Sequence, residues 1–216
     1  MAEVEQSAAR FAALGDPVRL ELIRYIQSSD RTVNELREYL EIGSSLLAHH
    51  LQVLEDVGLI ERRQSAADGR RRFVILRHEN LPYVRTNELT TKVLFVCTEN
   101  VARSQLASGI WAKLTGGLAR SAGTKPGVTV HPLTLRAAQR HGLEITNSIP
   151  RKLPNSIGRD TAVITVCDSA FEELGRDRVV AHWSIPDPVA LGTDRAFDQV
   201  VKELEHRIST TKGISQ

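Results

Sequence analysis

A weakly periodic stretch, His78–Thr91, divides this 216-residue chain into two halves with different hydrophobic patterns. Before it, helical spacing is followed by two short strand-like runs, whereas after it short apolar runs alternate with helical segments. A chain of this length accommodates one or two domains. We therefore predict a first domain over residues 1–80, a linker over residues 81–91 and a second domain over residues 92–216.

Charge and cysteine content exclude several classes of protein. Residues 1–85 hold 12 arginines, no lysine and 13 acidic residues, and the whole chain has a net charge of +2, so no global field marks a nucleic-acid-binding protein. Two cysteines, Cys97 and Cys167, are too few for a disulfide scaffold or a four-thiolate zinc site, and we expect no metal. Neither a secretory signal nor a membrane-spanning run is evident, so we expect a cytoplasmic protein without membrane contacts.

Capping signals and strand-like runs organise the first half. Helices are expected after Asp16, from the Thr32–Glu35 capping box, and over residues 44–57. Strands are expected over residues 59–64 and 71–76, joined by a Ser-Ala-Ala-Asp-Gly turn. A helix–turn–helix followed by a β-hairpin predicts a winged helix, mostly α-helical, with the hairpin as its wing.

Winged helices bind DNA by placing one helix in the major groove. The residues of helix 44–57 expected to face the groove are Ser44, Ser45, Leu46, His49 and Gln52. The hairpin carries five arginines suited to phosphates or to the minor groove, namely Arg62, Arg63, Arg70, Arg71 and Arg72. The alternative is a protein-interaction winged helix with a solvated basic hairpin, which the near-neutral charge of this half favours.

Residues 7–77 resemble the ArsR/SmtB family of dimeric repressors, through the strings Leu-Gly-Asp-Pro-x-Arg-Leu and His-His-Leu-x-Val-Leu. The resemblance implies a homodimer, formed through the N-terminal domain, on palindromic operator DNA. Arsenite-sensing members carry a Cys-Val-Cys-like pair where residues 31–36 hold no thiol. Because arsenite prefers thiolate ligands, that sensing site cannot exist in this half. His49 and His50 are adjacent on a helix and face apart, which disfavours a shared metal site.

The second half alternates strands with helices. The expected strands cover residues 92–96, 118–121, 161–166 and 178–182, and the expected helices cover residues 103–114, 131–141 and 194–208. This alternation predicts a three-layer α/β domain with a four-stranded parallel sheet. Sites in such domains lie at the carboxyl ends of the strands.

The loop after the first of these strands is the candidate catalytic site. Its residues are Cys97, Thr98, Glu99, Asn100, Val101, Ala102 and Arg103. The backbone N–H groups of such a loop can cradle a tetrahedral oxyanion, assisted by the N-terminus of the following helix. Arg103 can grip two oxygens of the anion, and the same positive field favours the thiolate form of a nucleophilic cysteine.

Three further side chains complete this prediction. Ser104 can donate a hydrogen bond to the Cys97 thiolate, and Asn100 can hold the shape of the loop. Asp187 stands between two prolines and is the expected general acid. The alternatives are a buried structural cysteine with an unrelated arginine, and an ordinary Pro-Asp-Pro turn.

Residues 92–209 resemble the low-molecular-weight tyrosine phosphatase superfamily, through VLFVCTENVARSQLA and SAGTKPG. The resemblance is closer to its arsenate reductase branch, because His182 and Trp183 precede Asp187, and Val189 follows where phosphatases usually place a tyrosine after Asp-Pro. Glu99 departs from the family, in which glycine is usual. An acid at this position would disfavour anionic substrates or alter the loop.

The resemblance implies that arsenate binds in the loop, Cys97 attacks arsenic, Asp187 protonates the departing hydroxyl and a second thiol releases arsenite. Cys167 matches the first of two further cysteines in the thioredoxin-coupled branch, but the second, near Leu174, is absent. Either Cys167 resolves the adduct, or an external thiol does, such as mycothiol, glutathione or a thioredoxin-type reductant. We favour the external thiol, with no tightly bound cofactor.

Three functions remain open for the whole chain. It is a repressor fused to an arsenate reductase, a low-molecular-weight protein tyrosine phosphatase tethered to a DNA-binding domain, or a regulator that senses an oxyanion such as arsenate or phosphate without turnover. Because both thiols lie in the second half, an arsenite response would depend on Cys97 or Cys167.

Overall fold

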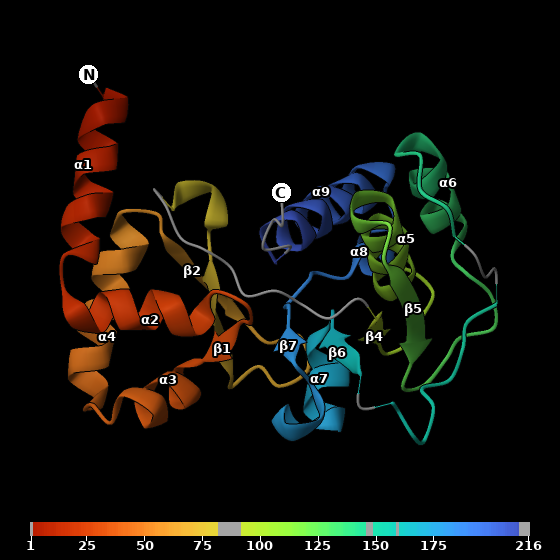
Figure 1. Cartoon of the computed structure of the whole chain (residues 1–216), viewed down its shortest axis with the longest axis horizontal. Helices are drawn as coiled ribbons and strands as arrows, with labels where there is room; N and C mark the ends of the chain where they lie inside the picture. The colour runs from red at the N-terminus through yellow and green to blue at the C-terminus, as the bar shows by residue number, and fades with distance from the viewer. Residues whose placement is uncertain (1, 82–91, 146–148, 159, 212–216) are drawn as a thin grey trace. The chain divides into compact units, whose positions relative to one another are not determined.

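The computed structural model describes residues 2–81, 92–145, 149–158 and 160–211 of the chain (Figure 1). Its contacts divide the chain into two units, Met1–Thr86 and Asn87–Gln216. The predicted linker over residues 81–91 lies outside the described residues except for its first position. No helix in the described ranges is long and apolar enough to cross a membrane.

The first unit combines four α-helices with a small antiparallel sheet. The helices are α1 (Ala2–Leu14), α2 (Pro17–Ile26), α3 (Val33–Leu40) and α4 (Ser44–Asp56). The strands are β1 (Arg31–Thr32), β2 (Ile60–Gln64) and β3 (Arg72–Leu76), in the order β1-β3-β2, followed by the 3₁₀ helix η1 (His78–Asn80). The helix–turn–helix and hairpin predicted from the sequence are therefore confirmed, with β1 as an additional strand.

Local capping explains where these helices begin. The Asp16 side chain accepts a hydrogen bond from the Arg19 backbone N–H at 3.0 Å and starts α2. Thr32 and Glu35 form both hydrogen bonds of a capping box at the start of α3. Leu51 and other buried aliphatic side chains of α2, α3 and α4 pack against β3 in one core.

The second unit holds a parallel sheet in the order β5-β4-β6-β7. The strands are β4 (Lys92–Cys97), β5 (Leu118–Gly123), β6 (Thr161–Thr165) and β7 (Ala181–His182). The helices are α5 (Arg103–Thr115), α6 (Pro132–Arg140), α7 (Asp168–Leu174), α8 (Pro188–Leu191) and α9 (Asp194–Thr211), with the 3₁₀ helix η2 (Arg176–Arg178). Helices α5 and α9 pack together on one side of the sheet and α7 lies on the other (Figure 1). The predicted four-stranded α/β domain is confirmed.

Several short elements differ from the prediction. The strand predicted over residues 178–182 is reduced to Ala181–His182, because Gly175, at φ 79°, ends α7 and the following charged residues form η2. Val180 is 53% exposed and does not extend the strand. Helices α7 and α8 have only seven and four residues, so no helical period marks them in the sequence.

Aromatic packing beneath the sheet fixes the end of β4. Phe95 is fully buried, and its ring lies 6.1 Å from that of Trp111 and 5.9 Å from that of Trp183. Two residues later, Cys97 ends the strand at the carboxyl edge of the sheet. This edge is where a parallel sheet places its functional loops.

Candidate functional site

The loop of residues 97–103 connects β4 to α5 and is braced from outside by the segment after β5. The Lys125 N–H donates to the Thr98 carbonyl, and the Gly127 N–H donates to the Glu99 carbonyl, each at 2.9 Å. A Cβ atom at Gly123 would lie 2.6 Å from the Thr98 oxygen, so only glycine allows this approach. The SAGTKPG segment therefore works as the outer wall of the loop.

The nucleophile candidate is surrounded by hydrogen-bond donors. Cys97 is 3% exposed, and its Sγ lies 3.0 Å from the Ser104 Oγ. The Asn100 N–H donates to the same sulfur at 3.2 Å, while the Asn100 Nδ2 donates to the Ser104 Oγ at 2.8 Å. Because that oxygen already accepts from Asn100, the Ser104 hydroxyl hydrogen is free to point at the sulfur. Both groups can therefore donate a hydrogen bond to the Cys97 sulfur.

Asn100 is the internal anchor of the loop. It is fully buried and adopts the left-handed region at φ 56°, a conformation that asparagine tolerates better than most residues. Its Oδ1 accepts from the Arg151 N–H at 2.8 Å and from the Gln105 Nε2 at 3.2 Å. The side chain thus ties the loop to α5 and to the segment that begins near Arg151.

Arg103 and Asp187 meet at the mouth of the loop. The Arg103 guanidinium donates to the Ile185 carbonyl at 3.1 Å and to the Asp187 Oδ2 at 3.0 Å. The other oxygen, Asp187 Oδ1, accepts from the Val189 N–H at 3.0 Å and caps α8. Both carboxylate oxygens therefore accept hydrogen bonds, and in this structure the Asp187 carboxylate is the partner of Arg103.

A cavity of about 390 Å³ lies over this loop. It is lined by Cys97, Thr98, Glu99, Val101, Ala102, Arg103, Ser169, Asp187, Val189 and Ala190. None of these lining residues is aromatic, so they offer no ring to hold an aryl group. The cavity suits a small tetrahedral anion, with a nucleophile at its floor and a guanidinium at its side.

Cys167 lies outside this set of lining residues. It is 1% exposed at the start of α7, and its Sγ lies 3.4 Å from the Thr98 Oγ1. Burial raises the pKa of the Cys167 thiol, an effect that the positive charge of Arg103 only partly opposes. Cys167 is therefore held as a neutral thiol beside the catalytic loop.

Two structural features near the site were missed in the sequence. Ser169, in the first turn of α7, lines the cavity. The fully buried His182, the last residue of β7, contacts both β6 and α7, because its Nδ1 lies 3.0 Å from the Thr165 Oγ1 and its Nε2 lies 3.3 Å from the Asp168 Oδ1. Its ring also stacks on Phe171, with the centroids 4.3 Å apart. The sequence marked His182 only as a residue that precedes Asp187, and its contacts with Thr165 and Asp168 were not predicted.

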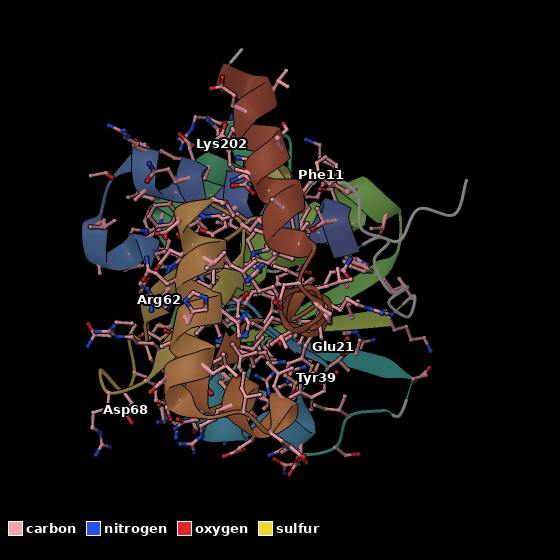
Figure 2. All side chains as sticks on the ribbon, turned by 90° about the vertical axis from the view of Figure 1, so that its left-hand side faces the viewer. Phe11, Glu21, Tyr39, Arg62, Asp68 and Lys202 are labelled. Carbon is pink, nitrogen blue, oxygen red and sulfur yellow. The ribbon has the colours of Figure 1, made fainter. Side chains whose placement is uncertain are left out.

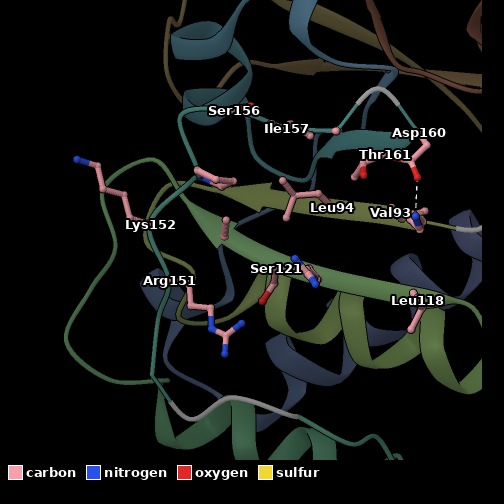
Figure 3. A pocket seen from close by; sticks show the side chains of 15 residues that line it. Val93, Leu94, Leu118, Ser121, Arg151, Lys152, Ser156, Ile157, Asp160 and Thr161 are labelled. Atoms are coloured by element: carbon pink, nitrogen blue, oxygen red, sulfur yellow. Dashed lines mark hydrogen bonds and ion pairs between the residues drawn. The ribbon is translucent and has the colours of Figure 1, made fainter.

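A second cavity, of about 480 Å³, lies at the opposite ends of the strands (Figure 3). Its lining includes the first residues of β4, β5 and β6, and the segment 151–158. Figure 3 shows Leu94 and Ile157 among the side chains that line it. The Asp160 carboxylate pairs with the Lys92 ammonium at 2.5 Å. No cysteine or histidine lines it, so the nucleophilic chemistry belongs to the cavity at the carboxyl ends.

The first unit exposes the residues predicted to read DNA. Ser44, Ser45 and His49 are exposed on the N-terminal half of α4, and Leu46 is 49% exposed beside them. Gln52 is also exposed, but its amide contacts Asp56 on the same helix. The N-terminal turn of α4 is therefore the freer part of this surface.

The five arginines of the hairpin fall into two groups. Arg62 pairs with Glu55 of α4 and also donates to Gln52 at 2.9 Å, and Arg63 pairs with Glu61 at 2.5 Å. The other three, Arg70, Arg71 and Arg72, are exposed, with the Arg70 side chain 92% exposed.

The tip of the hairpin also carries an acidic residue, Asp68. Figure 2 shows Arg62 beside α4 and Asp68 at the tip of the hairpin. Arg70 and Arg71 approach Asp68 at 3.0 and 3.6 Å, and the neighbouring guanidinium of Arg70 lowers the pKa of that carboxyl. The hairpin thus presents Arg70, Arg71 and Arg72 to solvent, whereas Arg62 and Arg63 serve its own framework.

Comparisons with known families match both units. Residues 92–212 match the family model described as low molecular weight phosphotyrosine protein phosphatase. Residues 16–62 match the model described as bacterial regulatory protein, arsR family. The first model covers more than half of the chain and includes the whole catalytic loop, α5 and α8.

Individual relatives match the second unit. The low molecular weight protein-tyrosine-phosphatase Etp of Escherichia coli is 31% identical over 130 residues, covering 52% of this chain and 86% of that protein. An arsenate reductase of Staphylococcus aureus is 29% identical over 128 residues, covering 56% of this chain and 95% of that protein.

A solved structure shares the same architecture. The arsenate reductase from Archaeoglobus fulgidus superposes with a TM-score of 0.50 at 29% identity, covering 57% of this chain and all of that one. The first family model covers the loop of residues 97–103 and the four strands of the parallel sheet. The chain therefore belongs to the low molecular weight phosphotyrosine protein phosphatase family and carries an arsR-family helix–turn–helix region ahead of that domain.

Proposed function

We propose that this chain is a DNA-binding repressor fused to a thiol-dependent arsenate reductase. The observation that carries the enzymatic part is the cavity over the loop, whose lining combines Cys97, with its sulfur accepting from the Asn100 N–H, and the Arg103 guanidinium, without an aromatic lining residue. Relatives of the second unit include both an arsenate reductase and a tyrosine phosphatase. A cavity without rings favours the small inorganic oxyanion over an aryl ester.

The first step forms a bond between sulfur and arsenic. The Cys97 thiolate attacks arsenate held by the loop, an As–O bond breaks, and the oxygen leaves as water after protonation. The hydroxyl of Ser104 and the N–H of Asn100 stabilise the thiolate before the attack. Arg103 binds two of the remaining oxygens.

Asp187 supplies the proton in this scheme after a change of partners. The bound oxyanion replaces Asp187 as the acceptor for the Arg103 guanidinium, and this releases the Oδ2 atom that accepts from it at 3.0 Å in the present structure. A proton on that oxygen then lies at the mouth of the cavity, next to the departing oxygen. The Val189 N–H keeps the other oxygen in place.

The second step takes electrons from outside the chain. An external thiolate attacks the Cys97 sulfur, an S–S bond forms, and the S–As bond breaks with its electron pair left on arsenic. Arsenic is thereby reduced from As(V) to As(III) and leaves as arsenite. A second external thiol reduces the mixed disulfide and restores Cys97. Cys167 is less suited to this role because burial raises its pKa and keeps the poorly nucleophilic thiol form.

The DNA-binding part rests on the first unit. A homodimer of this unit would place the exposed turn of α4, with Ser44, Ser45 and Leu46, in successive major grooves of operator DNA. The exposed arginines of the hairpin tip, such as Arg70, would contact phosphates. Arsenate would be the substrate of the second unit, and a cytoplasmic thiol its reductant.

One set of assays on the full chain separates this proposal from its alternatives. The purified protein is incubated with arsenate and a thiol, and separately with p-nitrophenyl phosphate, and its binding to promoter DNA is measured. Thiol-dependent arsenite formation is the expected result. Hydrolysis of the aryl phosphate without arsenite formation would identify a phosphatase, and phosphate binding without either reaction would identify an oxyanion sensor.

A further inference from the structure

We infer that Glu99 selects the external thiol by charge, so that thiols carrying a cationic group resolve the Cys97 adduct faster than thiols carrying an additional anionic group. This inference rests on the proposed reductase function and assigns a specificity-determining role to a residue of the loop.

The cavity holds one more carboxylate than its cation can balance. Its charged lining residues are Glu99, Arg103 and Asp187. Arg103 and Asp187 neutralise one another in an ion pair with a separation of 3.0 Å. Among the described residues, no ion pair involves Glu99, whose exposed side chain lines the cavity. In the arsenic adduct, where the bound oxyanion takes the place of Asp187 on Arg103, both carboxylates line the cavity that the thiolate enters, and Glu99 is the one without an ion pair among the described residues.

The backbone keeps this charge at the entrance. The Glu99 carbonyl accepts from the Gly127 N–H at 2.9 Å, and the next residue, Asn100, is anchored by its buried side chain. Lys125 is the cationic residue of the SAGTKPG segment that forms the outer wall of the loop. It pairs with Glu173 at 3.4 Å and does not line the cavity. A reductant that approaches the sulfur through the cavity therefore enters a space that Glu99 lines.

The attacking species is already an anion, and this makes the rim charge selective. A thiolate that also carries an ammonium group approaches as a zwitterion without net charge, whereas one with an additional carboxylate approaches as a dianion. With charges separated by several ångströms in a solvated rim, Coulomb energies correspond to a few-fold rate difference for each unit charge. Between the two kinds of thiol, Glu99 is expected to contribute a factor of about 10.

The test uses three small thiols of different charge: cysteamine, 2-mercaptoethanol and 3-mercaptopropionate. Arsenite formation by the full chain is measured at saturating arsenate, and kcat/KM for each thiol is determined. The quantity compared is the ratio of the cysteamine value to the 3-mercaptopropionate value. Because each protein variant is tested with the same thiols, their intrinsic reactivities cancel when ratios are compared between variants.

The variants separate the charge of Glu99 from its shape. Glu99→Gln is expected to lower the ratio about tenfold, and Glu99→Lys is expected to lower it further. The matched control is Asp177→Asn, which removes an exposed carboxylate outside the cavity lining and should leave the ratio unchanged. Raising the salt concentration to about 1 M shortens the Debye length to about 3 Å and should shrink the wild-type preference.

The outcomes are distinguishable. A ratio that falls in Glu99→Gln and stays at the wild-type value in Asp177→Asn supports the inference. Turnover with an unchanged ratio in Glu99→Gln overturns it and leaves the proposed reductase standing. No arsenite from the wild-type chain with any of the three thiols overturns the proposed function and this inference together.

Discussion

The Ser104 Oγ lies 3.0 Å from the Cys97 Sγ, and both atoms belong to buried side chains. Ser104 is the second residue of α5, and Cys97 is the last of β4. The contact therefore joins the end of a strand to the start of the helix across the whole catalytic loop. A change in the shape of the loop would therefore also change the hydrogen bonding of the Cys97 sulfur.

Removal of this hydroxyl tests the coupling. Ser104→Ala is expected to lower kcat for arsenite formation by roughly 10- to 100-fold, because a hydrogen bond to a charged group contributes about 1.5–3 kcal/mol. The measurement is the initial rate with saturating arsenate and 2-mercaptoethanol. Ser209→Ala, in the last turns of α9, is the matched control and should retain the wild-type rate. A Ser104→Ala rate within twofold of the wild type would show that the contact is not used.

Asn100 gives a prediction about stability. Asn100→Ala loses the side-chain hydrogen bonds and keeps a left-handed backbone that alanine tolerates poorly, whereas Asn100→Gly loses the same bonds without that strain. Glycine should therefore be the more stable variant by about 1 kcal/mol, although both are less stable than the wild type.

The measurement is urea unfolding followed by tryptophan fluorescence. Both tryptophans of the chain, Trp111 and Trp183, lie in the second unit, so their emission reports on that unit. Equal or reversed stabilities of the alanine and glycine variants would contradict the role assigned to the backbone of Asn100.

The raised pKa of Cys167 predicts that the free energy of unfolding depends on pH in the alkaline range. Its pKa is raised in the folded state by burial, so the unfolded chain loses this proton at lower pH than the folded chain. The resulting stabilisation is fully present below the unfolded pKa of about 8.5 and is lost as the pH rises from there through the folded pKa. The slope contributed by one group is at most about 1.4 kcal/mol per pH unit.

The comparison is between the wild type and Cys167→Ser in urea unfolding from neutral to alkaline pH. The difference in unfolding free energy should narrow or change sign as the pH rises, because only the wild type carries this titrating group. A difference that stays constant across the range would show that burial does not hold Cys167 in its neutral form.

The hairpin arginines differ in what they contribute to DNA binding. Arg70→Ala should weaken binding to duplex DNA of any sequence and reduce the slope of log K against log salt concentration by about 1, as expected for the loss of one phosphate contact. Arg62→Ala should change the slope less, because Arg62 is engaged by Glu55 within the unit. Fluorescence anisotropy at several salt concentrations measures both. A larger slope change for Arg62→Ala would refute the division of the hairpin into tip and framework.

The sequence specified the features that depend on neighbouring residues. Asp16 and the Thr32–Glu35 pair predict the starts of α2 and α3, because the capping hydrogen bonds span only three residues. The catalytic loop is equally local, since Cys97 and Arg103 lie on one connection between a strand and a helix. These signals predicted both folds and the candidate nucleophile.

Features that depend on distant residues were not predictable in the same way. The pairing of Arg103 with Asp187 joins residues 84 positions apart, and it adds a change of hydrogen-bond partners to the role proposed for Asp187. Arg62, which the sequence placed among the DNA-contacting arginines, pairs in the structure with Glu55 of another element. The sequence contains both partners in each case but not the folded geometry that brings them together.

In the proposed reaction Cys97 attacks arsenate and the electrons come from outside the chain, and arsenite formation with 2-mercaptoethanol measures both features. The full-length wild type and Cys167→Ser are expected to release many arsenite molecules per protein, and Cys97→Ser none. No arsenite from the wild type, or equal amounts from Cys97→Ser, would contradict the claim. Loss of turnover in Cys167→Ser alone would contradict the external origin of the resolving thiol.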